Sequence, residues 1–324
     1  MCTAITYQTK DFYFGRTFDY DISFAEEVTI TPRHFVLSYR NGITFSEHFA
    51  MIGMAHVVEE SPLYFDAVNE KGLAMAALNF EGYAQYGEPV SVKDNIAHFE
   101  LISWILGQCS SVTEALKKLE TIHITNEAFN RELPPSQLHW IIADHHRSIV
   151  VESQKNGLHI YDNPTGVLTN NPSFPEQLLH LTDFMGLSPQ EPENRFSESL
   201  SLKPYSRGMG AMGLPGDLSS RSRFVRAAFT KLNAQSGAGE MESVNQFFHI
   251  LGAVEQVKGC CRLENNACEM SLYTSCCNTD KGIYYYTTYE NHQICAIHLH
   301  REKLDDSFLI RYPLVHTEQI QQIN

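Results

Sequence analysis

Two runs of β-forming residues, joined by a polar turn, open the chain and constrain its fold more than any other feature. Residues 2–8 are rich in residues that favour strands, residues 10–11 are typical of a turn, and residues 12–18 form an aromatic-rich apolar run. The pattern predicts an antiparallel hairpin. It places Cys2 at the end of a strand, directly after the initiator methionine.

Cys2 is a candidate nucleophile because removal of Met1 would put a thiol and a free α-amine on one residue. The reference pKa is about 8.5 for a thiol and roughly 7.7 to 8.0 for an α-amine, so near neutral pH the amine can accept the thiol proton without a partner histidine. The small side chain of Cys2 permits this removal. A free cysteine is, however, more often a small apolar residue in a core, and Cys2 alone also fits that role.

Strands and helices follow in two blocks in which strands bracket helices. Periodicity and turn residues predict strands at 27–31, 35–39, 51–57, 73–79, 138–143, 148–152, 158–161, 282–288 and 293–299, and helices at 96–107, 111–119, 175–184, 222–232 and 244–254. Ser111 is expected to cap the second helix. Residues 188–216 are irregular and rich in Pro, Gly and Ser, and a loop of this length is usually functional, so we expect it to form a wall or lid over a site.

Composition narrows the class of protein. The 324 residues, 43% apolar and 19% charged, are typical of a globular protein with a substantial core, in one large domain or two. The net charge is −14, and the charged residues do not gather in long runs. This argues against nucleic acid or an anionic membrane surface as a partner. With no signal-like N-terminus and no bilayer-length apolar stretch, we expect a cytoplasmic protein.

The cysteines and histidines do not favour a metal site. Five of the eight cysteines cluster near the C-terminus without a Cys-x-x-Cys pair, which favours free or structural thiols over zinc: Cys260, Cys261, Cys268, Cys276 and Cys277. The sequence also lacks a Gly-x-Ser-x-Gly elbow, a P-loop and a His-Glu-x-x-His helix. We therefore expect no metal and no cofactor.

Polar residues at strand and helix ends are candidates to assist Cys2. Arg16 and Asp19 end the hairpin beside it, where a carboxylate can hold the α-amine and a guanidinium favours the thiolate. A surface ion pair fits the same spacing equally well. Asn79 and Asn170, at strand ends, can donate to a developing oxyanion, although asparagine before a turn is common. Arg223, at a helix start, also fits an ordinary surface charge.

Several motifs occur in order along the chain and carry a resemblance to a known family. They are Met1-Cys2-Thr3, Phe14-Gly15-Arg16-Thr17-Phe18-Asp19, Asn69-Glu70-Lys71-Gly72-Leu73, Leu78-Asn79-Phe80, Leu168-Thr169-Asn170, Gly213-Leu214-Pro215-Gly216-Asp217, Ser222-Arg223-Phe224 and Lys281-Gly282-Ile283-Tyr284-Tyr285-Tyr286. The chain resembles the choloylglycine hydrolase family of N-terminal nucleophile hydrolases over nearly its whole length. The resemblance implies one α+β domain over residues 1–324, a four-layer αββα sandwich, usually assembled as a homotetramer.

The resemblance also implies roles for the candidate residues. Cys2 is expected to be the nucleophile, with Arg16 and Asp19 tuning it, Asn79 and Asn170 supporting the oxyanion, and Arg223 completing the polar constellation. The chain resembles the bile salt hydrolase branch more than the penicillin V acylase branch, in Asn79, where many of those acylases carry Tyr, and in the Gly-Leu-Pro-Gly-Asp loop. The substrate expected is a small molecule, a bile salt conjugated to glycine or taurine.

Substrate contacts are expected on two sides of the nucleophile. Phe18, Phe24, Val58 and Phe65 are candidates for an apolar wall against a steroid, although apolar residues there also fit a core. Ser206-Arg207-Gly208 resembles the taurine-preferring version of the family loop, and Arg207 offers a charged fork for a sulfonate, unless it is an ordinary exposed arginine. A protein of another class, one that binds steroids without catalysis, is the alternative. The presence of Cys2, Arg16, Asp19, Asn79, Asn170 and Arg223 argues against it.

Overall fold

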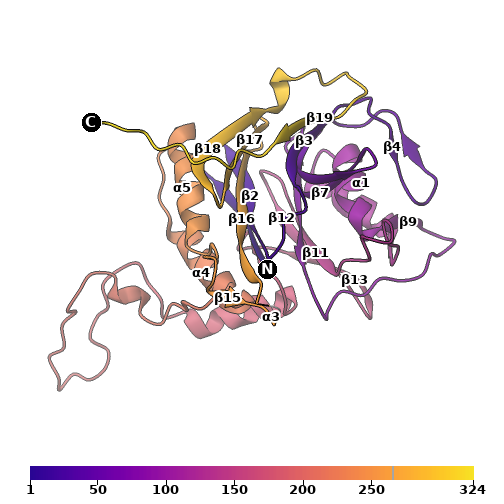
Figure 1. The fold of residues 1–324 in the computed structure, drawn as a ribbon. Coiled ribbons are helices and arrows are strands. Elements are labelled where there is room, and N and C mark those ends of the chain that lie inside the picture. Colours follow the sequence, from indigo (N-terminus) through magenta and orange to yellow (C-terminus); the bar gives the residue numbers. More distant parts are fainter. Residues whose placement is uncertain (265) are drawn as a thin grey trace.

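Two antiparallel sheets form the centre of the molecule (Figure 1). The structure, a computed structural model, describes residues 1–264 and 266–324. The first sheet has the order β14 (Val167–Leu168), β1 (Cys2–Gln8), β2 (Phe12–Tyr20), β16 (Cys268–Asn278), β17 (Ile283–Thr288) and β18 (Asn291–His298), with β15 (Cys261–Arg262) paired to β16. The second has the order β13 (Gly157–Asp162), β12 (Ser148–Gln154), β11 (Leu138–Ala143), β8 (Ala74–Asn79), β7 (Ser61–Asn69), β6 (Met51–Val58), β3 (Glu27–Thr31) and β19 (Ile310–Pro313).

Helices cover the outer faces of the two sheets, which gives four layers (Figure 1). On the first sheet lie α4 (Ser220–Asn233) and α5 (Glu240–Gly252), with α3 (Phe174–His180) against α4, and on the second lies α1 (Leu101–Gln108). The helix α2 (Val112–Thr121) belongs to the same apolar cluster as α1 and the second sheet. Small two-stranded pairs, β4 (Leu37–Ser38) with β5 (Thr44–Phe45) and β9 (Asp94–Ala97) with β10 (Ile122–Thr125), lie beside α1. Short 3-10 turns are η1 (His98–Glu100), η2 (Leu181–Phe184), η3 (Met209–Ala211) and η4 (Leu299–Arg301).

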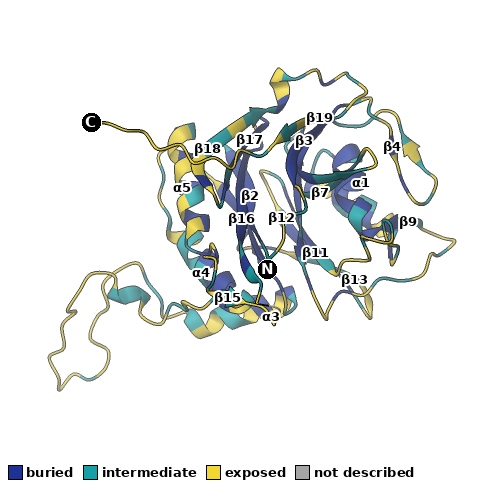
Figure 2. Cartoon of the chain, in the orientation of Figure 1, coloured by how far each residue is buried: buried dark blue, intermediate teal, exposed yellow. Residues whose placement is uncertain are grey.

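Burial follows this layering (Figure 2). One apolar cluster contains side chains from both sheets, such as Ile5 and Phe14 of the first and Ile52 and Ile141 of the second, together with Phe247 of α5. A second cluster lies between the second sheet and the helices α1 and α2. Removing this apolar surface from water stabilises the sandwich, since burial contributes about 25 cal/mol per Å².

The N-terminal hairpin has the predicted form, and its register explains where Cys2 lies. Cys2 pairs with Phe18, and Gln8 with Phe12. Gly15 on β2 cannot be replaced by a residue with a side chain without a clash. An added Cβ would lie 2.0 Å from the carbonyl oxygen of Ser275 on β16. The hairpin therefore packs directly against β16, in the middle of the first sheet.

Several other helices and strands begin or end at residues other than those predicted. The strand predicted at 35–39 is only Leu37–Ser38, and residues 94–97 form β9 ahead of a helix that begins at Leu101. Ser111 does cap α2, since its hydroxyl accepts a 3.3 Å hydrogen bond from the backbone N–H of Glu114. The strands β7, β16 and β19 were not predicted, and two of these supply polar groups to the site described below.

The segment 188–216 projects from the body of the molecule, at the lower left of Figure 1. Several large apolar side chains along it are exposed: Phe196, Leu200, Leu202, Tyr205 and Met212. Within this chain the segment does not line the cavity that Cys2 borders, so the expectation of a wall or lid is wrong for a single chain. All eight cysteines are free thiols. In the part of the chain that the structure describes, each helix falls short of the length and apolar character that a bilayer crossing requires.

Candidate active site

Cys2 borders a cavity of about 290 Å³ at the start of β1. The side chain is buried and shares the cavity wall with Arg16 and Asn79. Much of the remaining wall is apolar and aromatic, with Phe18, Tyr20, Phe24, Leu63, Phe65, Phe99, Ile102, Phe129, Leu133, Leu138 and Trp140. A thiol at the edge of an apolar cavity can meet a substrate whose body is hydrophobic.

The aromatic wall contains three of the four predicted apolar contacts. The ring of Phe18 lies 4.6 Å from Phe65 and 6.2 Å from Phe24, measured between centroids. Val58 is not part of this wall, because it ends β6 and pairs with Ser61 at the hairpin turn. Ser206, Arg207 and Gly208 lie in the projecting segment and do not line the cavity of their own chain.

Asn170 links the backbone of Cys2 to two other elements. Its Oδ1 accepts a 2.9 Å hydrogen bond from the Cys2 N–H and a 2.7 Å bond from Nη2 of Arg223. Its Nδ2 donates a 2.8 Å bond to the carbonyl oxygen of Asn79. The amide is thus engaged at both ends, and Asn170 does not border the cavity. Of the two asparagines expected to assist an oxyanion, Asn79 is the one on the cavity wall.

Arg223 fixes the same backbone from the side of α4. Its Nη1 donates to the carbonyl oxygen of Cys2 at 2.5 Å and to Oγ1 of Thr3 at 2.7 Å, and its Nε donates to the carbonyl oxygen of Leu218 at 3.0 Å. The side chain is fully buried, and burial lowers the pKa of its guanidinium. Arg223 therefore holds the backbone of the strand that begins at Cys2 and is not a surface charge.

Arg16 places a buried positive charge on the cavity wall. Its Nη1 donates to the carbonyl oxygens of Phe65 and Ala77, at 3.1 and 2.5 Å. Nη2 is buried and has no hydrogen-bond partner among the described residues. Burial works to lower the pKa of this guanidinium, but nearby negative groups, with Cys2 first among them, raise it overall. The geometry fits stabilisation of a thiolate.

Asp19 is buried, and three side chains donate hydrogen bonds to its carboxylate. Its Oδ1 accepts a 2.5 Å bond from the hydroxyl of Ser271, and its Oδ2 accepts bonds from Thr17 at 3.2 Å and from Gln256 at 3.3 Å. Sequence reasoning missed Ser271 and Gln256. Ser271 lies on the unpredicted strand β16, whose sequence lacks the apolar alternation that would have indicated a strand.

The α-amine of Met1, the residue before Cys2, contacts Asp19 and Glu269. The amine donates a 2.7 Å hydrogen bond to the backbone oxygen of Asp19 and pairs with the carboxylate of Glu269. The backbone N–H of Asp19 donates back to the carbonyl oxygen of Met1 at 3.0 Å. Burial is the main cause that lowers the pKa of this amine. While Met1 is present, the nitrogen of Cys2 is a peptide nitrogen and cannot act as a base.

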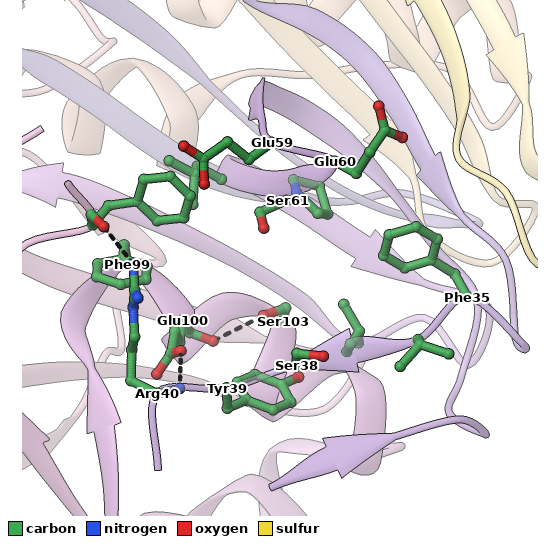
Figure 3. Close-up of a pocket in the computed structure, with 15 residues that line it drawn as sticks. Phe35, Ser38, Tyr39, Arg40, Glu59, Glu60, Ser61, Phe99, Glu100 and Ser103 are labelled. Carbon is green, nitrogen blue, oxygen red and sulfur yellow. Dashed lines mark hydrogen bonds between the residues drawn. The ribbon is translucent and has the colours of Figure 1, made fainter. Parts of the chain in front are cut away.

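A second cavity, of about 400 Å³, adjoins the first. Figure 3 shows the side chains that line it. Leu63, Phe99 and Phe129 line both cavities. Arg40 lies at its edge, with its guanidinium 5.8 and 5.3 Å from the ring centres of Phe99 and Phe129. These aromatic side chains therefore separate the Cys2 cavity from a more polar one. The polar cavity is lined by Ser38, Tyr39, Glu59, Glu60, Ser61, Glu100 and Ser103.

The fold is that of the N-terminal nucleophile hydrolases, and the class of protein is an amide hydrolase. The profile of the linear amide C-N hydrolases, choloylglycine hydrolase family, matches residues 2–312, and the chain belongs to this family. It is 55% identical over 324 residues to the "Bile salt hydrolase/transferase" of Lactiplantibacillus plantarum, and 37% identical over 330 residues to that of Clostridium perfringens, with 100% of both chains covered in each case.

Solved structures agree with the four-layer sandwich. The C2A mutant of the conjugated bile acid hydrolase from Clostridium perfringens superposes with a TM-score of 0.93 at 36% identity, and 100% of both chains is covered. A penicillin V acylase from Agrobacterium tumefaciens gives a TM-score of 0.79 at 17% identity, with 98% of this chain and 94% of that chain covered. The latter likeness concerns the fold alone. The predicted fold class and family are thus confirmed.

Proposed function

We propose that this protein hydrolyses the amide bond between the steroid carboxyl group and glycine or taurine in conjugated bile salts. The observation that carries the proposal is the thiol of Cys2 at the edge of an apolar, aromatic-walled cavity of about 290 Å³. The names of the relatives from Lactiplantibacillus plantarum and Clostridium perfringens support the choice of substrate.

The proposed reaction begins after removal of Met1. The Cys2 sulfur attacks the substrate carbonyl carbon while its proton passes to the freed α-amine, and that amine protonates the departing nitrogen as the C–N bond breaks. Water then attacks the thioester, gives a proton back through the amine and releases the carboxylic acid and the thiol. In this scheme Asn170 holds the amine nitrogen, Arg16 favours the thiolate and Asn79 faces the oxyanion.

The test uses the full chain without Met1, verified by intact mass. Taurocholate, glycocholate and penicillin V are compared, with free amine and free acid both quantified. Cleavage of the two bile salts at rates well above that of penicillin V supports the proposal. Turnover of penicillin V alone would place the chain with the acylase branch, and binding of bile salt without turnover would favour the idle steroid-binding protein.

A preference for taurine conjugates is a further part of the proposal and rests on Arg207. Arg207 lies in the projecting segment and does not line the Cys2 cavity of its own chain, so in this proposal it reaches the cavity of another copy in the expected homotetramer. Replacing Arg207 by Ala should lower the ratio of taurine to glycine release, in parallel with a mass measurement of the assembly. A strong preference of the unmodified protein for glycine would contradict this part.

Two remaining expectations belong to the same proposal. Residues 1–324 act as one domain, supported by the apolar cluster to which both sheets contribute. The protein works in the cytoplasm, where its eight free thiols would stay reduced. Limited proteolysis tests the first, because a single domain should yield no stable half-length fragment, and cell fractionation tests the second.

We also propose acyl transfer to amines as a second activity of the same thioester. The names of the two relatives include "transferase". Chemically, an amine that reaches the thioester carbonyl in place of water forms a new amide and releases the thiol. Incubation of taurocholate with glycine tests this, since glycocholate and cholate differ in mass and can be counted separately.

A further inference from the structure

Asp66 is a buried carboxylate on β7 that the reaction described above does not use. Its side chain is 2% exposed, and three hydroxyl groups donate hydrogen bonds to it. The hydroxyl of Tyr273 lies 2.7 Å from Oδ1, and those of Tyr284 and Ser275 lie 2.6 and 3.2 Å from Oδ2. Several hydrogen bonds to a carboxylate favour its charged form, so these groups stabilise a negative charge between the two sheets.

Two short connections join Asp66 to Arg16. The hydroxyl of Ser275, which donates to Asp66, also accepts a 3.2 Å hydrogen bond from the backbone N–H of Arg16. Nη1 of Arg16 donates to the carbonyl oxygen of Phe65, the residue directly before Asp66, at 3.1 Å. Burial works to lower the pKa of the Arg16 guanidinium, but negative groups raise it overall, Cys2 first and Asp66 among the others. Arg16 therefore interacts with two acidic groups, one on each side.

An irregularity in β7 produces this arrangement. The pairing of β7 with β6 shifts by one residue between Tyr64 and Asp66, so that Phe65 is an extra residue in β7. The backbone of such a residue is left out of the regular ladder, and here its carbonyl oxygen accepts a hydrogen bond from Arg16. The side chain of Phe65 lines the Cys2 cavity, while that of Asp66 does not. The shift thus places Asp66 next to the active site but outside the substrate cavity.

Arg16 is the positive group that acts on Asp66. Burial raises the pKa of the Asp66 carboxyl, and Arg16 and the hydroxyl donors work in the opposite direction. On its own sheet Asp66 pairs with Met54 and Ala76, which carry no charge. The titratable groups that act on it or respond to it from the first sheet are Arg16 of β2, Tyr273 and Cys277 of β16, and Tyr284 of β17.

We propose that Asp66 is a positioning residue for the reaction of Cys2 and acts through Arg16: its negative charge offsets part of the positive charge that Arg16 presents to the thiol. This inference rests on the proposed function, in which Arg16 favours the thiolate. With Asp66 present, the thiol keeps its proton until the α-amine of Cys2 accepts it. Without Asp66 the thiolate would be more stable and less reactive, because the nucleophilicity of a thiolate falls with its pKa.

The experiment compares the unmodified chain with Asp66→Asn, which removes the charge at nearly constant size, after the loss of Met1 is verified by mass. Alkylation of Cys2 by iodoacetamide is followed on the N-terminal peptide as a function of pH. We expect the midpoint to fall by about one pH unit, the lower end of the effect of a nearby charge. On taurocholate, kcat at its plateau should fall about threefold. KM should not change, because Asp66 does not line the cavity.

Two further variants separate the charge of Asp66 from its part in the fold. Glu100→Gln is the matched control, because Glu100 is also a buried carboxylate but accepts its hydrogen bonds from the backbone of Arg40 and Ala97. It should leave the midpoint unchanged. Tyr284→Phe removes the 2.6 Å bond to Asp66 and so favours the uncharged carboxyl. It should lower the midpoint in the same direction as Asp66→Asn, by a smaller amount.

The midpoint distinguishes this role from a purely structural one. An unchanged or raised midpoint in Asp66→Asn contradicts the inference, even if the variant loses thermal stability. If Asp66→Asn does not fold, Tyr284→Phe is the deciding variant, and an unchanged midpoint there has the same meaning. Alkylation of Cys2 requires no bile salt. If the unmodified protein cleaves no bile salt, the proposed function is wrong, and the effect of Asp66 on the thiol is still measured.

Discussion

The backbone N–H of Cys2 donates a 2.9 Å hydrogen bond to Oδ1 of Asn170. In a chain without Met1 this nitrogen is the α-amine, so the same oxygen would orient the base of the reaction. The amide nitrogen of Asn170 is already engaged with the carbonyl oxygen of Asn79. The contact favours a positioning role for Asn170, in contrast to the oxyanion role that the family resemblance implies.

Two substitutions at Asn170 distinguish these roles. Asn170→Asp keeps an oxygen acceptor for Cys2 and Arg223, whereas Asn170→Leu removes it and keeps the branching of the side chain. If the oxygen matters, kcat should fall within about tenfold for the first and on the order of 100-fold for the second, because a small misplacement of a reacting group has an effect of that size. Equal losses in both variants would instead indicate that the N–H donor is essential. Thermal unfolding of each variant is the control for damage to the fold.

Retention of Met1 should abolish activity. With Met1 in place, the nitrogen of Cys2 is an amide without a free electron pair for a proton, and the thiol lacks its base. Protein produced under inhibition of methionine aminopeptidase should hydrolyse taurocholate at least about 100-fold more slowly, which is the usual minimum for loss of a general base. Treatment with the purified aminopeptidase should restore the rate in step with the loss of the methionine mass. Full activity of a chain that still carries Met1 would exclude the amine as the base.

Replacing the sulfur should separate chemistry from binding. Cys2→Ser keeps a small buried group at the edge of the cavity, but a hydroxyl is a much weaker nucleophile at neutral pH. We expect kcat to fall about 1,000-fold or more while bile salt binding, measured by calorimetry, stays within a few-fold. Another cysteine, Cys295, is partly exposed on β18, and Cys295→Ser is the matched control. Substantial turnover by Cys2→Ser would contradict a thioester.

The sequence predicts the nucleophile and most of its neighbours but not the manner in which they are held. Residues near the hairpin, such as Arg16 and Asp19, are predictable because register places them beside Cys2. Arg223 fits an exposed charge by pattern, yet it is fully buried because the carbonyl of Cys2 and the amide of Asn170 accept its hydrogen bonds. Such long-range pairing leaves no periodic signal in either segment.

The missed strands have a common physical reason. β16 contains Ser, Thr, Cys and Asn in place of a clear apolar alternation, because its polar side chains are paired inside the molecule. Tyr273 and Ser275 on this strand, for example, donate to the buried carboxylate of Asp66 on β7. β7 itself contains Pro62 and Asp66, which are unfavourable for an isolated strand. Tertiary partners outweigh local propensity in both.

His98 should make the stability of the fold depend on pH below neutrality. It lies in η1 on the wall of the Cys2 cavity, and its Nε2 accepts a 3.0 Å hydrogen bond from the backbone N–H of Ser136. Burial lowers the pKa of His98 to about 4, from 6.5 for an unperturbed histidine. Between these values the unfolded chain binds the proton more readily, so the folded state loses stability as pH falls from 6.5 towards 4, and the contribution is fully present above 6.5.

The difference of pKa corresponds to a loss of about 3 kcal/mol over this interval. Urea unfolding at pH 7, 5.5 and 4 should therefore show a steeper decline for the unmodified chain than for His98→Phe, which cannot take up a proton and keeps the aromatic contact with Tyr86. His146→Gln, at an exposed histidine, controls for the removal of a histidine as such. Parallel declines in the unmodified chain and in His98→Phe would mean that other groups govern acid unfolding.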